Sequence, residues 1–85
     1  MASVIVTVKV QDRPAMLDLE VPLDMPAKAL LPGVILVVGM SGRIQPPRGP
    51  HTRIYSENQG RFLDDDETLE EAGIWEGSII VLKQS

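Results

Sequence analysis

The sequence predicts a small α+β domain in which a mixed sheet of four or five strands packs on one main helix. Three observations predict this class: two alternating apolar runs near the N-terminus, an apolar stripe at helical spacing after them, and a continuous apolar run near the C-terminus. The chain has 85 residues, which suit a single domain over residues 1–85. Because 44% of the residues are hydrophobic, they can form a core.

The N-terminal third of the chain predicts a β-hairpin. Residues 4–10 and residues 15–21 each alternate between apolar and polar side chains, which is typical of half-buried strands. Residues 11–14 have turn chemistry, and Pro22 ends the second strand because proline cannot donate to a strand ladder. The inward-facing residues would be Val4, Val6, Val8 and Val10 on the first strand and Leu17, Leu19 and Val21 on the second.

A helix ending at Val38 is predicted next. Asp24 would lie near its cap, Pro26 is tolerated in its first turn, and Gly39 would stop it. The core-facing stripe follows the i, i+3, i+4 rule and consists of Ala27, Leu30, Leu31, Val34, Ile35 and Val38.

Two features disturb this helix. Pro32 lies inside it, where proline removes a hydrogen bond at a cost of about 3 kcal/mol, so we expect a kink or a tightened first segment. Leu36 and Val37 fall on the face opposite the core stripe, where a solvated helix would carry charges. These two residues are therefore a candidate surface for a protein partner.

The rest of the chain predicts short elements and one long strand. Residues 40–52 are expected to form a loop because they include three prolines and two glycines. Residues 53–56 and 61–63 predict two short strands, and residues 68–73 a single helical turn that begins with a threonine cap and ends at a glycine. Residues 79–83 predict a central strand, because four successive apolar residues need burial on a sheet. The first and last strands should be parallel neighbours.

This order of elements is that of the β-grasp fold, and the residues resemble ubiquitin-like domains. Phe62–Ile74 resembles the segment that runs from a leucine through an acidic loop to threonine-leucine, a short turn and isoleucine. Gly77–Leu82 is similar to the turn and last strand that follow, and Ile44–Pro47 to the double-proline loop after the helix. The resemblance covers nearly the whole chain. It implies a ubiquitin-like fold with a short helical turn before the last strand.

Within that superfamily the chain resembles the YukD/EsaB group, small ubiquitin-like proteins that accompany bacterial type VII secretion systems. Residues 25–32, with their internal proline, are similar to the helix start of this group, and residues 68–79 are similar to its ending. The resemblance implies a bacterial, non-conjugated protein-binding module, an accessory or adaptor of a type VII-like secretion system. Its partners would then be secretion-system components.

Two other functions stay open. The chain could be a small ubiquitin-like structural subunit of a multicomponent enzyme, such as a diiron monooxygenase. A ubiquitin-type protein modifier is less favoured, because the residues Val81–Ser85 lack the Gly-Gly ending that an activating enzyme uses.

Composition limits the kinds of partner. The net charge is −4, and nucleic acid affinity rests on neutralising phosphates, so no nucleic-acid partner is expected. The charge is uneven, because residues 57–76 hold eight acids and one base, whereas residues 28–53 hold four bases and no acid. The absence of cysteine favours a cytoplasmic protein. With neither a signal peptide nor an apolar stretch of spanning length, no direct membrane insertion is expected.

No catalytic, cofactor or metal site is expected, so the chain should not be an enzyme. His51, the only histidine, lies in the proline-rich loop without a cysteine or second histidine to share a metal. A Ser-His-Asp arrangement would need a cleft that so small a domain does not offer. Residues 64–67 are acidic but lack the spacing, the mid-loop glycine and the distal glutamate of an EF-hand loop.

The outward-facing residues of the sheet form the main candidate surface. Strand alternation turns Ile79 and Val81 outward, and it turns Tyr55 outward on the neighbouring strand. A basic rim beside them would consist of Arg43, Arg48 and Arg53. Trp75 is expected to cover the edge of the core. Scattered apolar residues are normal on a protein surface, so an alternative is that these residues only complete the sheet.

Overall fold

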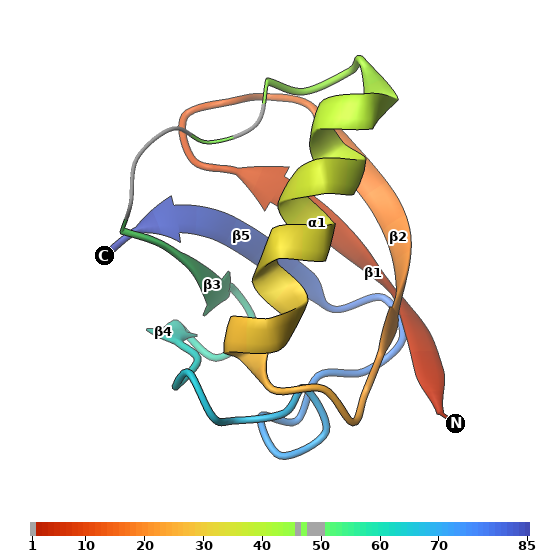
Figure 1. Ribbon diagram of the computed structural model, residues 1–85, viewed down its shortest axis with the longest axis vertical. Helices are drawn as coiled ribbons and strands as arrows, with labels where there is room; N and C mark the ends of the chain where they lie inside the picture. The colour runs from red at the N-terminus through yellow and green to blue at the C-terminus, as the bar shows by residue number, and fades with distance from the viewer. Residues whose placement is uncertain (1, 46, 48–50) are drawn as a thin grey trace.

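The computed structural model, which describes residues 2–45, 47 and 51–85, has one helix lying across one face of a five-stranded mixed sheet (Figure 1). The strands are β1 (Ser3–Val10), β2 (Met16–Pro22), β3 (Thr52–Ser56), β4 (Arg61–Phe62) and β5 (Ile79–Gln84), and the helix is α1 (Ala27–Ser41). Their order in the sheet is β2-β1-β5-β3-β4. The predicted α+β class and β-grasp order are therefore confirmed.

The two central strands, β1 and β5, run parallel, as predicted. Their register joins Thr7 to Ile79 at one end and Val10 to Leu82 at the other. β2 pairs with β1 and β3 pairs with β5, both antiparallel, so β2 flanks the central pair on one side and the β3–β4 hairpin flanks it on the other. Segments far apart in the sequence are thereby held side by side in one sheet (Figure 1).

The core lies between α1 and the inner face of the sheet. Strand alternation is as expected, because Val6, Ile54 and Ile80 are buried while their sequence neighbours are more exposed. The helix contributes the buried residues Ala27, Leu30, Val34 and Val38, with Leu31 and Ile35 packed partly against them. The core-facing stripe predicted from the sequence is therefore confirmed.

The helix ends differ from the predicted ones. Pro26 is the N-cap, and no side chain caps the helix, so Asp24 does not have the predicted role. The first free N–H groups instead bond to a distant segment: Ala27 N–H donates to the carbonyl oxygen of Glu67 at 2.8 Å, and Lys28 N–H to that of Asp65 at 3.0 Å. Tertiary contacts thus satisfy the donors that a side-chain cap would otherwise satisfy.

At the other end, α1 continues through Gly39 to Ser41. Gly42 forms the cap, with φ +69° in the left-handed region that glycine adopts without steric cost. The prediction that Gly39 stops the helix is wrong, because Gly39 keeps a negative φ and the left-handed conformation occurs only at Gly42.

Pro32 does not interrupt α1, which runs unbroken from Ala27 to Ser41. The first turn is tightened, since the carbonyl oxygen of Pro26 accepts the N–H groups of both Ala29 and Leu30 at 3.0 Å. Pro32 itself is exposed to solvent.

The predicted single helical turn before the last strand is present. Thr68 and Glu71 form a capping box, in which Glu71 N–H donates to Thr68 Oγ1 at 3.1 Å and Thr68 N–H to Glu71 Oε1 at 2.9 Å. Ala72 N–H then donates to the carbonyl oxygen of Thr68 at 3.0 Å, and Gly73 closes the turn with φ +73°. Within the described part of the chain, no helix is both long and apolar enough to cross a membrane.

Candidate protein-binding surface

The sheet register lines up four half-buried side chains in one row across the outer face of the sheet. Tyr55 on β3 lies opposite Val81 on β5, and Val81 in turn lies opposite Lys9 on β1. On the other side, Tyr55 lies opposite Phe62 on β4. We call Lys9, Val81, Tyr55 and Phe62 the outer sheet row. The row brings together residues that are up to 72 positions apart, because it runs from β1 across β5 to the β3–β4 hairpin.

The aromatic end of this row is flanked by two cations. The rings of Tyr55 and Phe62 meet edge to face, with centroids 5.2 Å apart and planes at 76°. Lys83 Nζ lies 4.3 Å from the Tyr55 centroid, and Arg53 Cζ lies 5.1 Å from the Phe62 centroid. Such cation–π contacts at exposed sites contribute about 0.5–1 kcal/mol each, so they favour positions of the cations over the rings.

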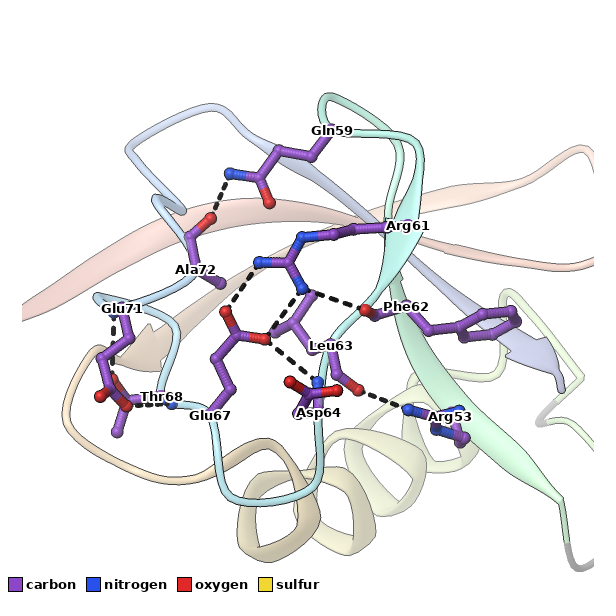
Figure 2. A network of polar contacts seen from close by, with 10 residues as sticks. All are labelled: Arg53, Gln59, Arg61, Phe62, Leu63, Asp64, Glu67, Thr68, Glu71 and Ala72. Carbon is purple, nitrogen blue, oxygen red and sulfur yellow. Dashed lines mark hydrogen bonds and ion pairs between the residues drawn. The ribbon is translucent and has the colours of Figure 1, made fainter.

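These two cations keep their positive charge available. Arg53 also donates from Nη2 to the carbonyl oxygen of Leu63 at 2.8 Å (Figure 2), which anchors the guanidinium without neutralising it. Among the described residues, no carboxylate lies within ion-pair distance of Arg53 or Lys83, whereas Lys9 pairs with Glu57 at 3.4 Å. The aromatic end of the row is therefore locally basic in a chain whose net charge is −4.

The predicted surface residues fall in three places. Tyr55, Val81 and Arg53 belong to the row or adjoin it, and Ile79 lies one level away on β5, half-buried and opposite Thr7. Arg43 follows the helix cap and lines an open depression together with Ile79. Arg48 lies outside the described residues. Leu36 and Val37 lie on α1, on the opposite side of the molecule from the outer sheet row, and are 62% and 38% exposed.

Sequence reasoning missed two features of the surface. Phe62 and Lys83 join Tyr55 only through cross-strand register, which no local pattern reveals. Trp75 does not cover the core edge as predicted, since its side chain is 73% exposed and Ile74, 3% exposed, fills that position instead. The prediction is wrong because Trp75 begins a tight turn, in which its backbone N–H donates to Ser78 Oγ at 2.9 Å.

The acidic loop, residues 64–67, makes hydrogen bonds and an ion pair that stabilise the fold (Figure 2). Glu67 forms a two-pronged ion pair with Arg61, Nη2 to Oε2 at 2.7 Å and Nη1 to Oε1 at 2.9 Å, and its Oε1 also accepts Asp64 N–H at 3.1 Å. The hydrogen bond from Arg61 lowers the pKa of the Glu67 carboxyl; partial burial opposes this shift and the Asp64 N–H adds to it. Gln59 makes a separate contact nearby by donating to the carbonyl oxygen of Ala72 (Figure 2). The part of the chain that the structure describes holds no cluster of three or more metal-ligating side chains.

Comparisons with known proteins agree with this fold. The family model described as WXG100 protein secretion system (Wss), protein YukD, matches residues 3–82. Comparison with curated protein sequences gives no match.

Several solved structures have the same fold. The EccD5 ubiquitin-like domain from Mycobacterium xenopi is 15% identical, with a TM-score of 0.82 over 100% of this chain and 97% of that chain. The ubiquitin-like domain of the Mycobacterium tuberculosis type VII secretion system protein EccD1 is 22% identical, with a TM-score of 0.77 over 96% of this chain and 98% of that chain. The ubiquitin of Caldiarchaeum subterraneum is 26% identical, with a TM-score of 0.65 over 99% of this chain and 95% of that chain. A ubiquitin-like architecture is common to all of them.

Proposed function

This chain belongs to the YukD family of the WXG100 protein secretion system, and from that membership we propose that it is an adaptor that binds another protein component of such a system. The contact surface in this proposal is the outer sheet row with Ile79 beside it. The adaptor would act on the cytoplasmic side of the assembly.

The observation that carries the proposal is the arrangement of the outer sheet row. Val81 and Tyr55 form an apolar centre, and Lys9, Arg53 and Lys83 form a charged rim around it. An apolar centre with a polar rim is the usual anatomy of a protein interface, and tyrosine and arginine are enriched among the residues that dominate binding energy. Burying the Tyr55 ring under a partner would also strengthen its contact with Lys83, because cation–π attraction grows when water is removed.

The unneutralised cations indicate the chemistry of the partner. A segment that places an aliphatic or aromatic side chain over Val81 and carboxylates beside Arg53 and Lys83 would match both parts of the surface. Lys9 would contribute less, since Glu57 already balances its charge.

One further comparison supports a partner within the secretion assembly. A chain of the MycP5-free ESX-5 inner membrane complex matches 98% of this chain over 21% of its own length, at 13% identity and a TM-score of 0.79. A domain of this fold therefore occurs inside a large protein of a secretion membrane complex. We propose that the present chain makes a contact of the same general kind, protein to protein, with a component of its own system.

The proposal is tested by capture from cells that express the secretion system, with the captured proteins identified by mass spectrometry. The double variant Tyr55→Ala/Val81→Asp should lose a secretion component that the wild type captures, because a carboxylate at the centre of a desolvated contact costs several kcal/mol. Met40→Asp is the matched control, since Met40 is 77% exposed and lies on α1, on the opposite side of the sheet from the outer sheet row. Circular dichroism must show that all three proteins are folded.

Two results would contradict the proposal. In one, the folded double variant captures the same component as efficiently as the wild type. In the other, the wild type captures no component of the secretion system.

A further inference from the structure

Trp75 presents the only indole of the chain to solvent. The residue is 73% exposed, and the neighbouring core position is filled by Ile74. Tryptophan carries a large apolar ring system, most of which is buried in an average folded protein. It is also among the residue types most enriched at positions that dominate binding energy in protein interfaces. An exposed indole that does not contribute to the core therefore indicates a surface for another molecule.

The backbone that carries this indole is held in place by several hydrogen bonds. Trp75 N–H donates to Ser78 Oγ at 2.9 Å, and the carbonyl oxygen of Trp75 accepts Ser78 N–H at 3.0 Å. Gly77, with φ +83°, donates its N–H to the carbonyl oxygen of Ile5 at 2.8 Å, and the Glu76 carboxylate accepts Ile5 N–H. The turn before β5 is thus fastened to β1 (Figure 1). Because this backbone is already ordered, a partner that contacts the indole pays a smaller entropy cost.

Ile5 adds a second exposed apolar residue beside this turn. It is 50% exposed and lies on the outer face of the sheet. Lys9 of the outer sheet row is four residues further along β1, which is about 13 Å at the spacing of a strand. Trp75 and Ile5 therefore provide an apolar centre that is separate from the outer sheet row, at the end of the sheet where β1 begins.

Two carboxylates flank Ile5. Glu76 accepts its N–H, and Glu20 lies directly opposite it on β2. Both acids are exposed, and in the part of the chain that the structure describes neither has a cation within ion-pair distance. Glu20 Oε2 accepts the Ser3 hydroxyl at 2.6 Å, a neutral donor that leaves the negative charge in place. Residues 62–82, which include the Trp75 turn, hold seven acids and no base. The apolar centre thus has an acidic rim, in contrast to the basic aromatic end of the outer sheet row.

We propose that Trp75, Ile5, Glu20 and Glu76, which we call the tryptophan surface, bind an arginine-containing segment of a protein partner. The face of an indole attracts cations, and a flat guanidinium can stack on it while donating paired hydrogen bonds to a carboxylate, which a lysine ammonium cannot do. An aliphatic residue next to that arginine would cover Ile5. Contact between two tryptophan surfaces is disfavoured, because it would bring the acids of both copies together. The proposal does not rest on the outer sheet row, so either surface can fail without the other.

Intrinsic fluorescence tests the proposal directly, because Trp75 is the only tryptophan of the full chain. The probe is a capped peptide of sequence leucine-arginine-alanine-leucine-arginine, titrated from about 10 µM to about 5 mM. It should change the Trp75 emission with a dissociation constant of about 1 mM or below. The same peptide with lysine in place of arginine should bind at least about threefold more weakly. A version with glutamate should cause no saturable change.

Variants that keep the tryptophan separate this site from general attraction between an acidic chain and a basic peptide. Glu76→Gln and Glu20→Gln should each weaken the arginine peptide at least about threefold, and both keep an oxygen that can accept the present hydrogen bond. Asp12→Asn is the matched control, because it makes the same change in net charge at the far end of β1, and asparagine tolerates its φ of +65°. It should bind like the wild type.

Four results would overturn the proposal. The arginine peptide could give no saturable signal, or it could bind no more tightly than the lysine peptide. Asp12→Asn could weaken binding as much as Glu76→Gln, which would show that only net charge matters. Finally, the Trp75 emission could change with the concentration of the chain alone, which would identify a second copy as the occupant.

Discussion

Lys83 on β5 holds its ammonium nitrogen 4.3 Å from the centroid of the Tyr55 ring on β3. The same nitrogen lies 6.0 Å from the centroid of Phe62 on β4, so one cation spans the aromatic end of the outer sheet row. This contact orders the lysine without neutralising it. The charge is therefore positioned for a carboxylate that a partner would bring.

Removing this cation should affect binding more than folding. Lys83→Met should lower the free energy of unfolding by no more than about 1 kcal/mol in urea denaturation, the size of an exposed cation–π contact. It should weaken binding to the captured secretion component and reduce the salt dependence of that binding, because one charge contact is lost. Unchanged affinity together with unchanged salt dependence would exclude Lys83 from the interface.

The Arg61–Glu67 pair should make stability depend on pH. The pKa of Glu67 is lowered in the folded chain, chiefly by the hydrogen bond from Arg61, so the pair stabilises the fold above the unfolded glutamate pKa of about 4.3. That stabilisation is lost as the pH falls through the lower folded pKa. The difference in unfolding free energy between the wild type and Arg61→Gln should be constant near neutral pH and should shrink below about pH 4. A difference that stays the same down to pH 2 would show that the pair is not responsible.

The position of the helix end can be tested with two glycines. Gly42→Ala should destabilise the chain by about 1–2 kcal/mol, because φ +69° is strained for an L side chain. Gly39→Ala should instead stabilise it by about 0.5–1 kcal/mol, since Gly39 lies exposed inside the helix. Urea denaturation at low protein concentration measures both. The opposite order of stability would mean that α1 ends at Gly39.

Ser56 is buried, and its hydroxyl oxygen has no hydrogen-bond partner among the residues that the structure describes. Ser56→Ala should therefore leave the free energy of unfolding unchanged or raise it by up to about 1 kcal/mol, because it removes an unsatisfied polar group. Ser78→Ala is the matched control: Ser78 is also buried, but its oxygen accepts Trp75 N–H, so its loss should cost about 1 kcal/mol or more. Equal losses in both variants would show that the Ser56 hydroxyl is satisfied in solution.

Much of the fold follows from local patterns. Alternation in residues 4–10 and 79–83 places the inward side chains correctly, and alternation in residues 53–56 turns Tyr55 to the same outer face as Val81. The alternation of inward and outward side chains holds in any strand, because successive side chains point to opposite faces whichever strand lies beside it. The core stripe of α1 follows for the corresponding reason in a helix.

What the sequence could not supply depends on tertiary contacts. Asp24 is a good capping residue, but the N-terminus of α1 is satisfied by the carbonyl groups of Asp65 and Glu67, which local sequence does not reveal. Gly39 and Gly42 are both glycines, so residue type alone does not show which of them ends the helix. The path of the backbone decides that Gly42 adopts positive φ. The placement of Lys83 over Tyr55 likewise rests on the β3–β5 register.

The central claim is that the outer sheet row binds a secretion component. The most direct measurement is an NMR titration of the isotopically labelled chain with the soluble part of the component that it captures, following the backbone amide of every residue other than proline. We expect the largest shift changes at Tyr55, Val81 and Lys83, with Leu36 and Met40 on α1 unaffected. Changes confined to exposed residues of α1, with the outer sheet row unperturbed at saturation, would contradict the claim.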